Sequence, residues 1–380
     1  MGIAKPVLYF YTNMPTPYQL DFFGALKHYF DLTVVYFTDR ESDRQWELAS
    51  TGDGYRTIVL KNGWLAGLVQ KFKPSFHFAK GIKKNVADAQ ADFIIINGTY
   101  WSPNVIYSLN MAARKEIRVA FWSEPVFPVN SKLKKWVKSL LLGPVKKHAD
   151  MLLAIGEKAE ECYRWYGFSK PIHNIPYNID TGLFKEANLD PAVLDDLRNT
   201  YKSNGELIFL SSGSLIHRKG MDLIINAFKV LDPGINARLL IIGDGQEKAA
   251  LQELAAGNGR IHFLGFQDKH IIPYWFNLCE VFVFASRYDG WALVINEAMA
   301  SGKAIICANS VGAAYNSLVD GKNALIVESE DVAGFATAMH ELLINKALRD
   351  HLGKEAFITG EGISSESMAK KLYDIYQLGK

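Results

Sequence analysis

The sequence of 380 residues contains few cysteines and no long hydrophobic run. Its three cysteines, Cys162, Cys279 and Cys307, lie far apart and form no Cys-x-x-Cys pair, which argues against a disulfide framework and against a zinc site. No apolar stretch approaches the roughly 18 residues that a membrane-spanning helix needs. The first residues show no signal-peptide pattern, so we expect a cytoplasmic protein.

Two common ligand-binding motifs are also missing. The sequence contains no Asp-x-Asp, so no metal–diphosphate clamp is apparent. The turn after the first apolar run reads TNMPTPY instead of G-x-G-x-x-G, and GDG at 243–245 has no third glycine. A dinucleotide-dependent oxidoreductase is therefore disfavoured.

Charge is nearly balanced over the whole chain but not along it. The formal net charge is +2. Residues 1–180 contain 23 Lys and Arg against 16 Asp and Glu, a net charge of +7, which leaves −5 for the other residues. The first half is therefore suited to anionic surfaces. The overall balance, and the lack of any helix-turn-helix, RNP or zinc-finger pattern, argue against a nucleic-acid partner.

Short, uniformly apolar runs alternate with helical patterns along most of the chain. Such runs are typical of parallel strands that are covered on both faces. They occur at residues 6–12, 31–37, 92–97, 117–122 and 151–155, and again at 207–213, 237–243, 260–265, 281–286 and 303–308. Helical patterns fall at 17–29, 74–90, 103–115, 130–148, 220–231, 246–256, 269–278 and 293–301.

Two such series predict an α/β protein with two Rossmann-like, doubly wound parallel sheets. We expect an N-terminal domain at 1–182 and a C-terminal domain at 183–362, with polar residues 185–205 as the linker. Residues 363–380 hold one more amphipathic helix, which we expect to pack back toward the first domain. Because ligands of such sheets bind beyond the carboxyl ends of the strands, we expect the site in the cleft between domains.

The first loop with chemical interest is SSGSLIHRKGMDLIINAF, residues 211–228. An apolar run ends in small residues, turns through Gly213 and enters a helix after Lys219. Amides at a helix start, beside the two cations Arg218 and Lys219, make an anion site. A solvated Arg-Lys pair is the alternative, but cations at a helix N-terminus oppose the helix dipole and cost energy unless an anion is present.

The second loop lies in SRYDGWALVINEAMASGKAIICANSVGAA, residues 286–314. Asp289 falls on the loop and Glu297 about one turn into the following helix, where it could accept hydrogen bonds from both hydroxyls of a ribose. A carboxylate that only favours the first turn of a helix is the alternative. The amides at the helix start that could receive a diphosphate are those of Gly290, Trp291, Ala292 and Leu293.

These residues resemble the donor motif of glycosyltransferase family 4, whose members have the GT-B fold. DGWALVINEAMASGKAIIC looks like the family's motif of an acidic residue, Gly, an aromatic and a later Glu, with Asp289 in place of the commoner glutamate and Ala292 in place of a glycine. IPYNIDTGLF at 175–184 resembles the family's NGVD segment. Residues 241–255 and 261–286 follow in family order, whereas the N-terminal half is similar only in TNMPTPYQLDFF and in its strand–helix rhythm.

The resemblance implies roles for particular residues in binding a nucleotide-diphosphate sugar, such as a UDP- or GDP-sugar. Lys219 with Arg218 would hold the diphosphate, and Glu297 would bind the ribose. Asp289 would lie beside the transferred sugar. Many relatives carry Arg where this chain has Ser214. The other donor-binding positions would be Gly213, Gly243, Phe266 beside the base, and the helix-start residues Gly290, Trp291, Ala292 and Leu293.

The resemblance also implies transfer with retained anomeric configuration and without a metal or a tightly bound cofactor. Leaving-group charge would then be balanced by Arg218, Lys219 and helix-start amides. An oxocarbenium-like transition state needs carboxylates nearby, so we predict Asp289 and Glu124 as catalytic residues. Glu124, in FWSEP, could orient or deprotonate the acceptor hydroxyl, or it could be a surface carboxylate before a proline turn. The isolated His28, His77 and His148 are interpreted as structural or solvated.

Two basic segments with aromatic residues point to the acceptor. Residues 130–148 carry six lysines and no acid, and residues 54–87 carry seven Lys and Arg and no acid. Each segment could be a wet face of a helix packed on the sheet. Together they favour peripheral contact with the cytoplasmic face of the inner membrane. We therefore predict a lipid-linked saccharide or a cell-envelope polysaccharide or glycolipid as the acceptor. Leu133, Trp136, Val137, Leu140 and Leu141 form one apolar face, and Trp64, Phe72, Phe76 and Phe78 lie in the other segment.

Other functions on the same fold stay open. A sugar-nucleotide epimerase would use the same donor site, but its histidine and carboxylate pattern cannot be placed here. A phosphorylase would need a pyridoxal-phosphate lysine motif, and none stands out. A non-catalytic two-domain protein that binds a sugar or nucleotide is the alternative from another class; a periplasmic receptor of that kind would need a secretion signal.

Overall fold

The computed structural model describes residues 4–38, 54–62 and 78–379. These residues form two compact units, which we describe separately. Unit 1 contains the described residues up to Asn178 together with the C-terminal helix that begins at Ser365. Unit 2 is Ile179–Ser364. The domain boundaries at 182/183 and 362/363 remain predictions about separately acting domains.

Unit 1 is built on a seven-stranded sheet in the order β3-β2-β1-β6-β7-β8-β9, in which every neighbouring pair is parallel. The inner strands are buried on both faces, which is why their sequences are uniformly apolar. The strands are β1 (Val7–Thr12), β2 (Asp31–Tyr36), β3 (Arg56–Val59), β6 (Phe93–Asn97), β7 (Arg118–Ser123), β8 (Met151–Ala154) and β9 (Ile172–Asn174).

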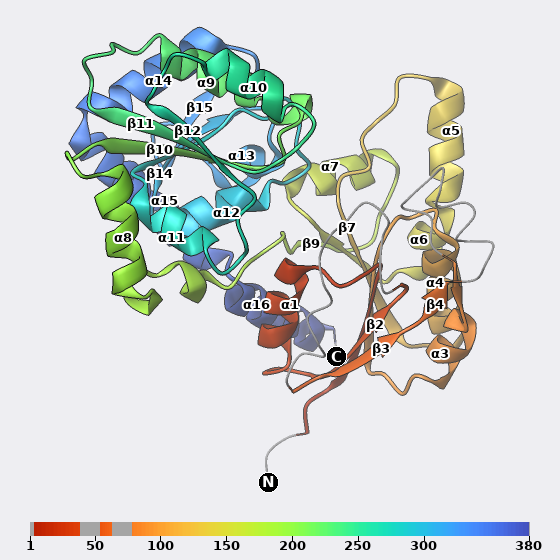
Figure 1. Cartoon of the computed structure of the whole chain (residues 1–380). Helices are drawn as coiled ribbons and strands as arrows, with labels where there is room; N and C mark the ends of the chain where they lie inside the picture. The colour runs from red at the N-terminus through yellow and green to blue at the C-terminus, as the bar shows by residue number, and fades with distance from the viewer. Residues whose placement is uncertain (1–3, 39–53, 63–77, 380) are drawn as a thin grey trace. The chain divides into compact units, whose positions relative to one another are not determined.

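Helices cover this sheet, and a short antiparallel pair of β4 (Lys61–Asn62) and β5 (Ala79–Lys80) is separate from it. Helix α16 (Ser365–Leu378) packs beside α1 (Pro17–Leu26), as Figure 1 shows. Tyr376 of α16 contacts Phe30 and Phe93, so the end of the chain completes the core of unit 1. The other helices are α3 (Ile82–Asp88), α4 (Pro103–Arg114), α5 (Lys132–Leu141), α6 (Gly143–His148) and α7 (Glu157–Trp165).

Unit 2 contains a six-stranded parallel sheet in the order β12-β11-β10-β13-β14-β15. Its strands are β10 (Leu207–Ser212), β11 (Ala237–Ile242), β12 (Ile261–Gly265), β13 (Val281–Phe284), β14 (Ala304–Ala308) and β15 (Leu325–Val327). Its helices are α8 (Pro191–Tyr201), α9 (Met221–Lys229), α10 (Lys248–Ala255), α11 (Ile272–Leu278), α12 (Leu293–Ala300), α13 (Gly312–Ser317), α14 (Val332–Ile344) and α15 (Lys346–Gly362), with 3-10 turns η1 (Thr181–Phe184), η2 (Glu186–Asn188) and η3 (His217–Lys219).

Each sheet reverses its direction of growth at one place. In unit 1 the chain adds β2 on one side of β1 and later β6 on the other side. In unit 2 it adds β11 and then β12 on one side of β10, and β13 on the other. Ligands of doubly wound sheets bind beyond the carboxyl ends of the strands at such a switch point. The loops after β1 and β6, and those after β10 and β13, are therefore the places to examine.

Three expectations about local structure need correction. Residues 185–205 are not a plain linker, because Asp190 caps helix α8, whose Leu194 is buried. The helix expected at 130–148 is interrupted: α5 ends at Leu141, and a second helix, α6, begins at Gly143 because Pro144 favours a helix start. Of the helix expected at 74–90, only α3 is helical in the described part, since Ala79–Lys80 is strand β5.

None of the helices in residues 4–38, 54–62 and 78–379 combines the length and the apolar character that crossing a membrane requires. Part of the basic segment 54–87, including Trp64, Phe72, Phe76 and His77, lies outside the described residues.

Candidate functional site

The loop after β10 is held against the loop after β13 by their main chains. Gly220 starts α9 with φ 67°, and a Cβ atom there would lie only 2.1 Å from the carbonyl oxygen of Ala285. Only glycine permits both this backbone angle and this approach. The amide of Arg287 donates to the Arg218 carbonyl at 2.8 Å, and so the two loops at the switch point run together.

Arg218 and Lys219 meet Asp289 across these two loops. Lys219 Nζ lies 2.5 Å from Asp289 Oδ2, and Arg218 Nη1 lies 3.3 Å from the same oxygen. Arg218 Nη1 also donates to the Tyr288 carbonyl at 2.7 Å. Lys219 is half-buried and stands 5.1 Å from the centre of the Phe284 ring. This cluster brings together three predicted site residues that come from positions 70 residues apart.

The same cluster corrects the argument that the two cations need an external anion. Cations before a helix N-terminus oppose the helix dipole. In this structure the Asp289 carboxylate supplies the compensating negative charge. The pair alone therefore does not require a ligand, and a ligand phosphate would have to compete with Asp289.

Arg287 fixes the loop that carries Asp289. Its guanidinium donates to Asp222 Oδ1 and Oδ2 at 2.8 and 2.7 Å, to the His217 carbonyl at 2.6 Å and to Glu330 at 2.5 Å. The hydrogen bond from Arg287 holds the pKa of Asp222 below its ordinary value, and the bond to Asp222 raises the pKa of Arg287. Motif reading did not select this residue, although a cation next to the Asp289 turn was a usable signal.

The start of α12 is pressed against the loop after β14. The carbonyl oxygens of Asp289 and Trp291 accept from the amides of Gly312 and Ala313, each at 2.9 Å. The Trp291 indole is buried and donates to Asn296 Oδ1 at 2.9 Å, so its ring packs under the helix. Ala292, at the N-cap, has φ 72° and ψ 81°, a left-handed conformation that favours glycine. Gly290 lies two residues before this strained residue, and Leu293 directly follows it.

Glu297 lies four residues into α12 and is almost completely buried, with 3% of its surface exposed. A carboxylate is costly to bury unless hydrogen-bond donors or cations surround it. Its position, like that of the amides at the start of α12, follows the sequence prediction. Its proposed contact with a ribose stays a prediction.

The loops after β10, β11 and β12 are joined by their glycines. Gly213 N–H donates to the Ile242 carbonyl at 3.0 Å, and Gly243 N–H donates to the Gly265 carbonyl at 2.8 Å. A Cβ atom on Gly243 would lie 2.0 Å from the Gly213 carbonyl oxygen. These two amides are engaged within the protein, so the glycines serve close approach of the loops. Phe266 follows Gly265 and is 67% exposed.

A polar network at the switch point of unit 1 was missed by motif reading. Thr12 Oγ1 donates to Asn97 Oδ1 at 2.9 Å, and Gln19 Nε2 donates to the same oxygen at 3.3 Å. Asn13 Oδ1 is buried without a hydrogen-bond partner among the described residues. The available signal was the polar residue that ends each of the two apolar runs, Thr12 and Asn97.

Glu124 follows β7 at the same edge of the unit 1 sheet and is exposed. Its Oε1 accepts from the Tyr177 hydroxyl at 2.8 Å. Tyr177 in turn packs edge-on against Trp122, whose carbonyl accepts from Asn97 Nδ2 at 3.0 Å. Glu124 is therefore connected to the polar network of unit 1 through two aromatic residues.

Solved structures share this fold along the whole chain. The Anabaena protein HepE in complex with UDP superposes with a TM-score of 0.77 at 16% identity, covering 98% of this chain and 100% of that one. WaaG, a glycosyltransferase involved in lipopolysaccharide biosynthesis, gives a TM-score of 0.68 at 14% identity, covering 97% and 99%. At these identities the likeness concerns the fold alone. It confirms the predicted GT-B class, with two doubly wound parallel sheets.

A family model matches the larger part of unit 2. Residues 195–358 match the family model of group 1 glycosyl transferases. This group 1 region contains Arg218, Lys219, Asp289 and Glu297.

Curated relatives match part of the chain. The lipopolysaccharide core biosynthesis glycosyltransferase LpsE of Rhizobium meliloti is 31% identical over 169 residues, which cover 44% of this chain and 48% of the relative. A GDP-mannose-dependent phosphatidylinositol monomannoside mannosyltransferase of Mycobacterium tuberculosis is 28% identical over 192 residues, covering 48% and 49%. The chain thus spans about half the length of these relatives.

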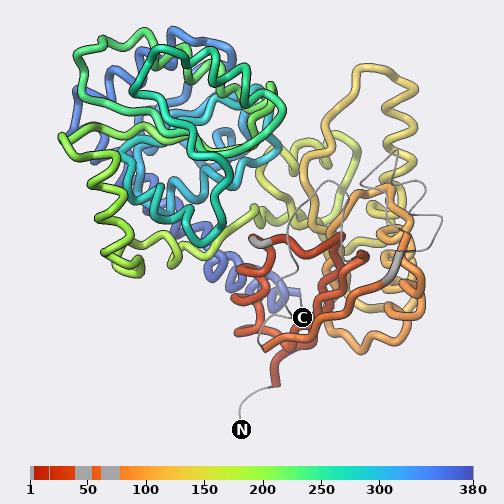
Figure 2. The backbone as a smooth tube through the Cα atoms, in the orientation of Figure 1, coloured from red at the N-terminus to blue at the C-terminus, as the bar shows by residue number. Residues whose placement is uncertain are grey.

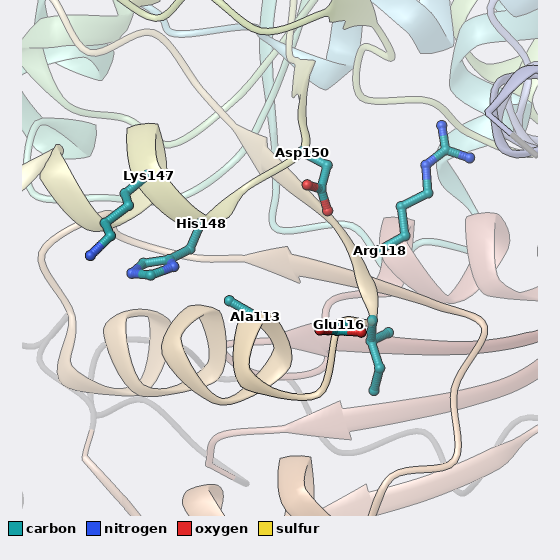
Figure 3. A pocket seen from close by; sticks show the side chains of 7 residues that line it. Ala113, Glu116, Arg118, Lys147, His148 and Asp150 are labelled. Carbon is teal, nitrogen blue, oxygen red and sulfur yellow. The ribbon is translucent and has the colours of Figure 1, made fainter.

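A pocket outside the group 1 region lies at the opposite edge of the unit 1 sheet. Its volume is about 380 Å³, and it is lined at the amino ends of β7 and β8 (Figure 3). Asp150 accepts from the Val119 amide at 2.8 Å, and Arg118 donates to the Tyr376 carbonyl at 2.7 Å. Burial and the charges of Lys147 and Lys170 lower the pKa of His148. Because Arg118 and Asp150 are hydrogen-bonded within the protein, we assign this pocket no ligand.

No set of three His, Cys, Asp or Glu side chains in the part of the chain that the structure describes is arranged to hold a metal ion. The three cysteines are buried and unpaired with one another.

Proposed function

We propose that this chain is a glycosyltransferase that moves a sugar from a nucleotide-diphosphate sugar, a UDP- or GDP-sugar, to a saccharide or lipid-linked acceptor. The observation that carries this proposal is the cluster of Arg218 and Lys219 with Asp289. It is formed by the two loops of the unit 2 switch point, inside the group 1 region. Cations at this place in a doubly wound sheet are suited to a diphosphate.

Donor binding would exchange one anion for another. A diphosphate carries more negative charge than a carboxylate, so it would take Arg218 and Lys219 from Asp289, and helix-start amides of α12 would complete its coordination. The released Asp289 would then be available to hydroxyls of the transferred sugar. In this way the cations would be balanced in both states, and Asp289 would become a sugar contact only when donor is present.

The nucleoside would extend from this point over the same edge of the sheet. We propose that Glu297 receives the ribose hydroxyls, and that exposed Phe266, beside Gly243 and Gly265, lies at the base. Two observations support a nucleotide here: HepE was solved with UDP and with UDP-glucose, and the loops after β10, β11 and β12 are joined at their glycines.

The chemistry we infer is retaining transfer of the family 4 type without a metal. This rests on the resemblance of 286–314 to that family and on the absence of Asp-x-Asp from the sequence. Arg218, Lys219 and the helix-start amides would stabilise the leaving diphosphate. Glu124 and the network of Thr12, Gln19 and Asn97 would orient the acceptor hydroxyl, with Glu124 as the group that accepts its proton.

The acceptor would belong to the cell envelope. Relatives include a lipopolysaccharide core biosynthesis glycosyltransferase and a phosphatidylinositol monomannoside mannosyltransferase, and both names refer to a lipid-containing saccharide. The basic segments 54–87 and 130–148 support the same direction, because they would place the protein at the cytoplasmic face of an anionic membrane.

A thermal-shift titration with UDP, GDP, ADP and CMP and their sugar conjugates tests the donor site. A ligand at about 100 times its Kd stabilises the native state by about 2.7 kcal/mol, so one nucleotide should stand out. The shift should disappear in Lys219→Ala and fall in Glu297→Gln, and it should persist in the control Lys229→Ala, whose ammonium binds the Leu254 carbonyl instead. No shift with any nucleotide, or an equal shift in Lys219→Ala, would reject the proposal.

A further inference from the structure

Helix α5 of unit 1 presents its apolar face to solvent. Leu133, Trp136, Val137 and Leu140 follow the i, i+3, i+4, i+7 spacing of one helix face. α5 buries none of its residues, and Figures 1 and 2 show it standing off from the sheet of unit 1. The four side chains of this face are exposed, Leu133 by 69%, Trp136 by 63%, Leu140 by 62% and Val137 by 40%, and the neighbouring Leu141 is 37% exposed.

The opposite face of α5 is the one that contacts the protein, and it is largely polar. This face contains Lys135, Lys138, Ser139 and Leu142, each two positions after a residue of the apolar face. Two positions correspond to a rotation of about 200° around the helix axis. Lys135 Nζ lies 3.9 Å from the Trp165 ring, and Lys138 Nζ donates to the Phe127 carbonyl at 3.0 Å. Ser139 Oγ accepts from Lys146 Nζ at 2.9 Å. The usual orientation of an amphipathic helix is thus reversed.

Charge borders the exposed apolar face on both sides. Lys132 and Lys134 lie about 100° to either side of it, and both are exposed. No Asp or Glu occurs from Pro125 to Ala149, so no acid opposes these cations along this stretch of chain. Lys135, Lys138 and Lys146 do not belong to this border, because they are engaged with unit 1.

We propose that α5 docks on an anionic lipid surface, with Leu133, Trp136, Val137 and Leu140 inserted at the headgroup level and Lys132 and Lys134 against the anionic headgroups. An apolar face with tryptophan and flanking lysines has the composition of an interfacial helix. A second copy of the chain is a poorer occupant. A helix of ten residues is only about 15 Å long and about 10 Å wide, far from the roughly 800 Å² per partner of a stable interface.

This inference deepens the proposed function by naming the surface at which a lipid-linked acceptor would be met. It narrows the earlier expectation from a basic segment of 19 residues to one helix face with two border lysines. The link between this surface and the acceptor rests on the proposed glycosyltransferase function. The proposal that α5 binds a lipid surface rests only on the exposed apolar face and lysines of α5.

The test measures partition of the full chain between buffer and vesicles, either of phosphatidylcholine alone or of phosphatidylcholine mixed with phosphatidylserine. We expect binding to the mixed vesicles, with quenching of Trp136 by brominated lipid that is missing in Trp136→Phe. Lys132→Glu with Lys134→Glu should weaken binding at least roughly 25-fold, because each lysine near such a surface contributes roughly a fivefold factor. Lys322→Glu with Lys354→Glu, exposed lysines of unit 2, are the matched control and should change little.

Replacing Leu133, Trp136 and Leu140 together by serine should abolish vesicle binding without lowering the melting temperature, since these side chains are exposed. A lowered melting temperature would mean that the face packs within the protein, and would overturn the proposal. A parent dimer that this variant dissociates, with vesicle binding unchanged, would assign the face to self-association instead. A parent chain that never binds mixed vesicles would also overturn it.

The same samples separate this inference from the proposed function. Each α5 variant should keep the nucleotide-induced thermal shift of the parent, because Lys219 and Asp289 lie in unit 2. Vesicle binding without any nucleotide shift would leave the docking surface standing and reject the donor site. A nucleotide-induced thermal shift without vesicle binding would support the donor site and reject the docking surface.

Discussion

At the scale of single residues, the Lys219–Asp289 ion pair balances charge within the proposed donor site. Lys219 is half-buried, and an unpaired ammonium there would be unfavourable. Asp289 neutralises it at 2.5 Å, while Trp291 N–H donates to the other carboxylate oxygen at 3.3 Å. The resemblance to family 4 implies that both residues belong to a donor site, but their distance from one another depends on the meeting of two loops.

Asp289→Asn separates the two roles that we propose for this carboxylate. The variant removes the anion that competes with the diphosphate, so affinity for the nucleoside diphosphate without sugar should stay equal or rise. Sugar transfer should fall at least roughly tenfold, because a charge-assisted hydrogen bond to the sugar is lost. Calorimetric titration and initial rates measure the two effects. Loss of nucleotide affinity together with unchanged transfer would contradict the exchange of anions.

Ala292 carries a backbone conformation that its side chain disfavours. With φ 72°, an L-residue costs about 1–2 kcal/mol relative to the right-handed region. Ala292→Gly should therefore stabilise the protein by about 1 kcal/mol after the greater chain entropy of unfolded glycine is subtracted. Chemical denaturation measures this difference. A destabilised variant would show that the buried methyl group contributes more than the strain removes.

At the scale of secondary-structure elements, the site is made by loops, and the Arg287 side chain joins several of them by hydrogen bonds. It reaches His217 before α9, Asp222 within α9 and Glu330 before α14. A planar guanidinium can bind several acceptors in one plane, which lysine cannot do. Arg287 is therefore a positioning residue, since it holds the loop that carries Asp289 without a proposed contact to substrate.

In a kinetic measurement, Arg287→Ala should raise the KM for the donor roughly tenfold or more with a smaller change in kcat, and Arg287→Lys should restore little of the loss.

A separate test of the Arg287–Asp222 pair uses the lowered pKa of Asp222. The stabilisation by this pair is complete above the ordinary value of 3.8 and is lost as pH falls through the lowered value. The free energy of unfolding, measured between neutral and acid pH, should therefore fall less steeply with decreasing pH in Asp222→Asn than in the parent protein.

The ends of helices are the features that the average sequence pattern predicts least well. The pattern of 130–148 predicts one helix, because both halves are basic and amphipathic. Pro144, which favours the start of a new helix, marks the place where the structure has two helices. The polarity of residues 185–205 predicts a linker, although Asp190 and Pro191 are a strong helix start and only Leu194 is buried. In both places the local start signal was more informative than average polarity.

At the scale of the whole molecule, the predicted donor residues all belong to unit 2, whereas Glu124 and the Thr12 network belong to unit 1. A nucleotide should therefore stabilise unit 2 directly. Calorimetry should show two transitions, and saturation at about 100 times Kd should raise the transition of unit 2 by roughly 5–10 °C. Leu152→Ala and Leu240→Ala, in the cores of units 1 and 2, assign the transitions. Equal shifts of both transitions would contradict a site confined to unit 2.

The sequence by itself determined the fold class and the identity of most candidate residues. Short, uniformly apolar runs that alternate with helical patterns are typical of strands covered on both faces. Loops such as 213–220 and 286–292 carry their glycines and charges in the sequence. The tertiary structure decided which side chains meet. Asp289 neutralises Lys219 because β10 and β13 are neighbours, and sequence periodicity does not encode strand order. The structure also decided that the apolar face of α5 is bare, because a helical pattern defines two faces but not which of them the protein covers.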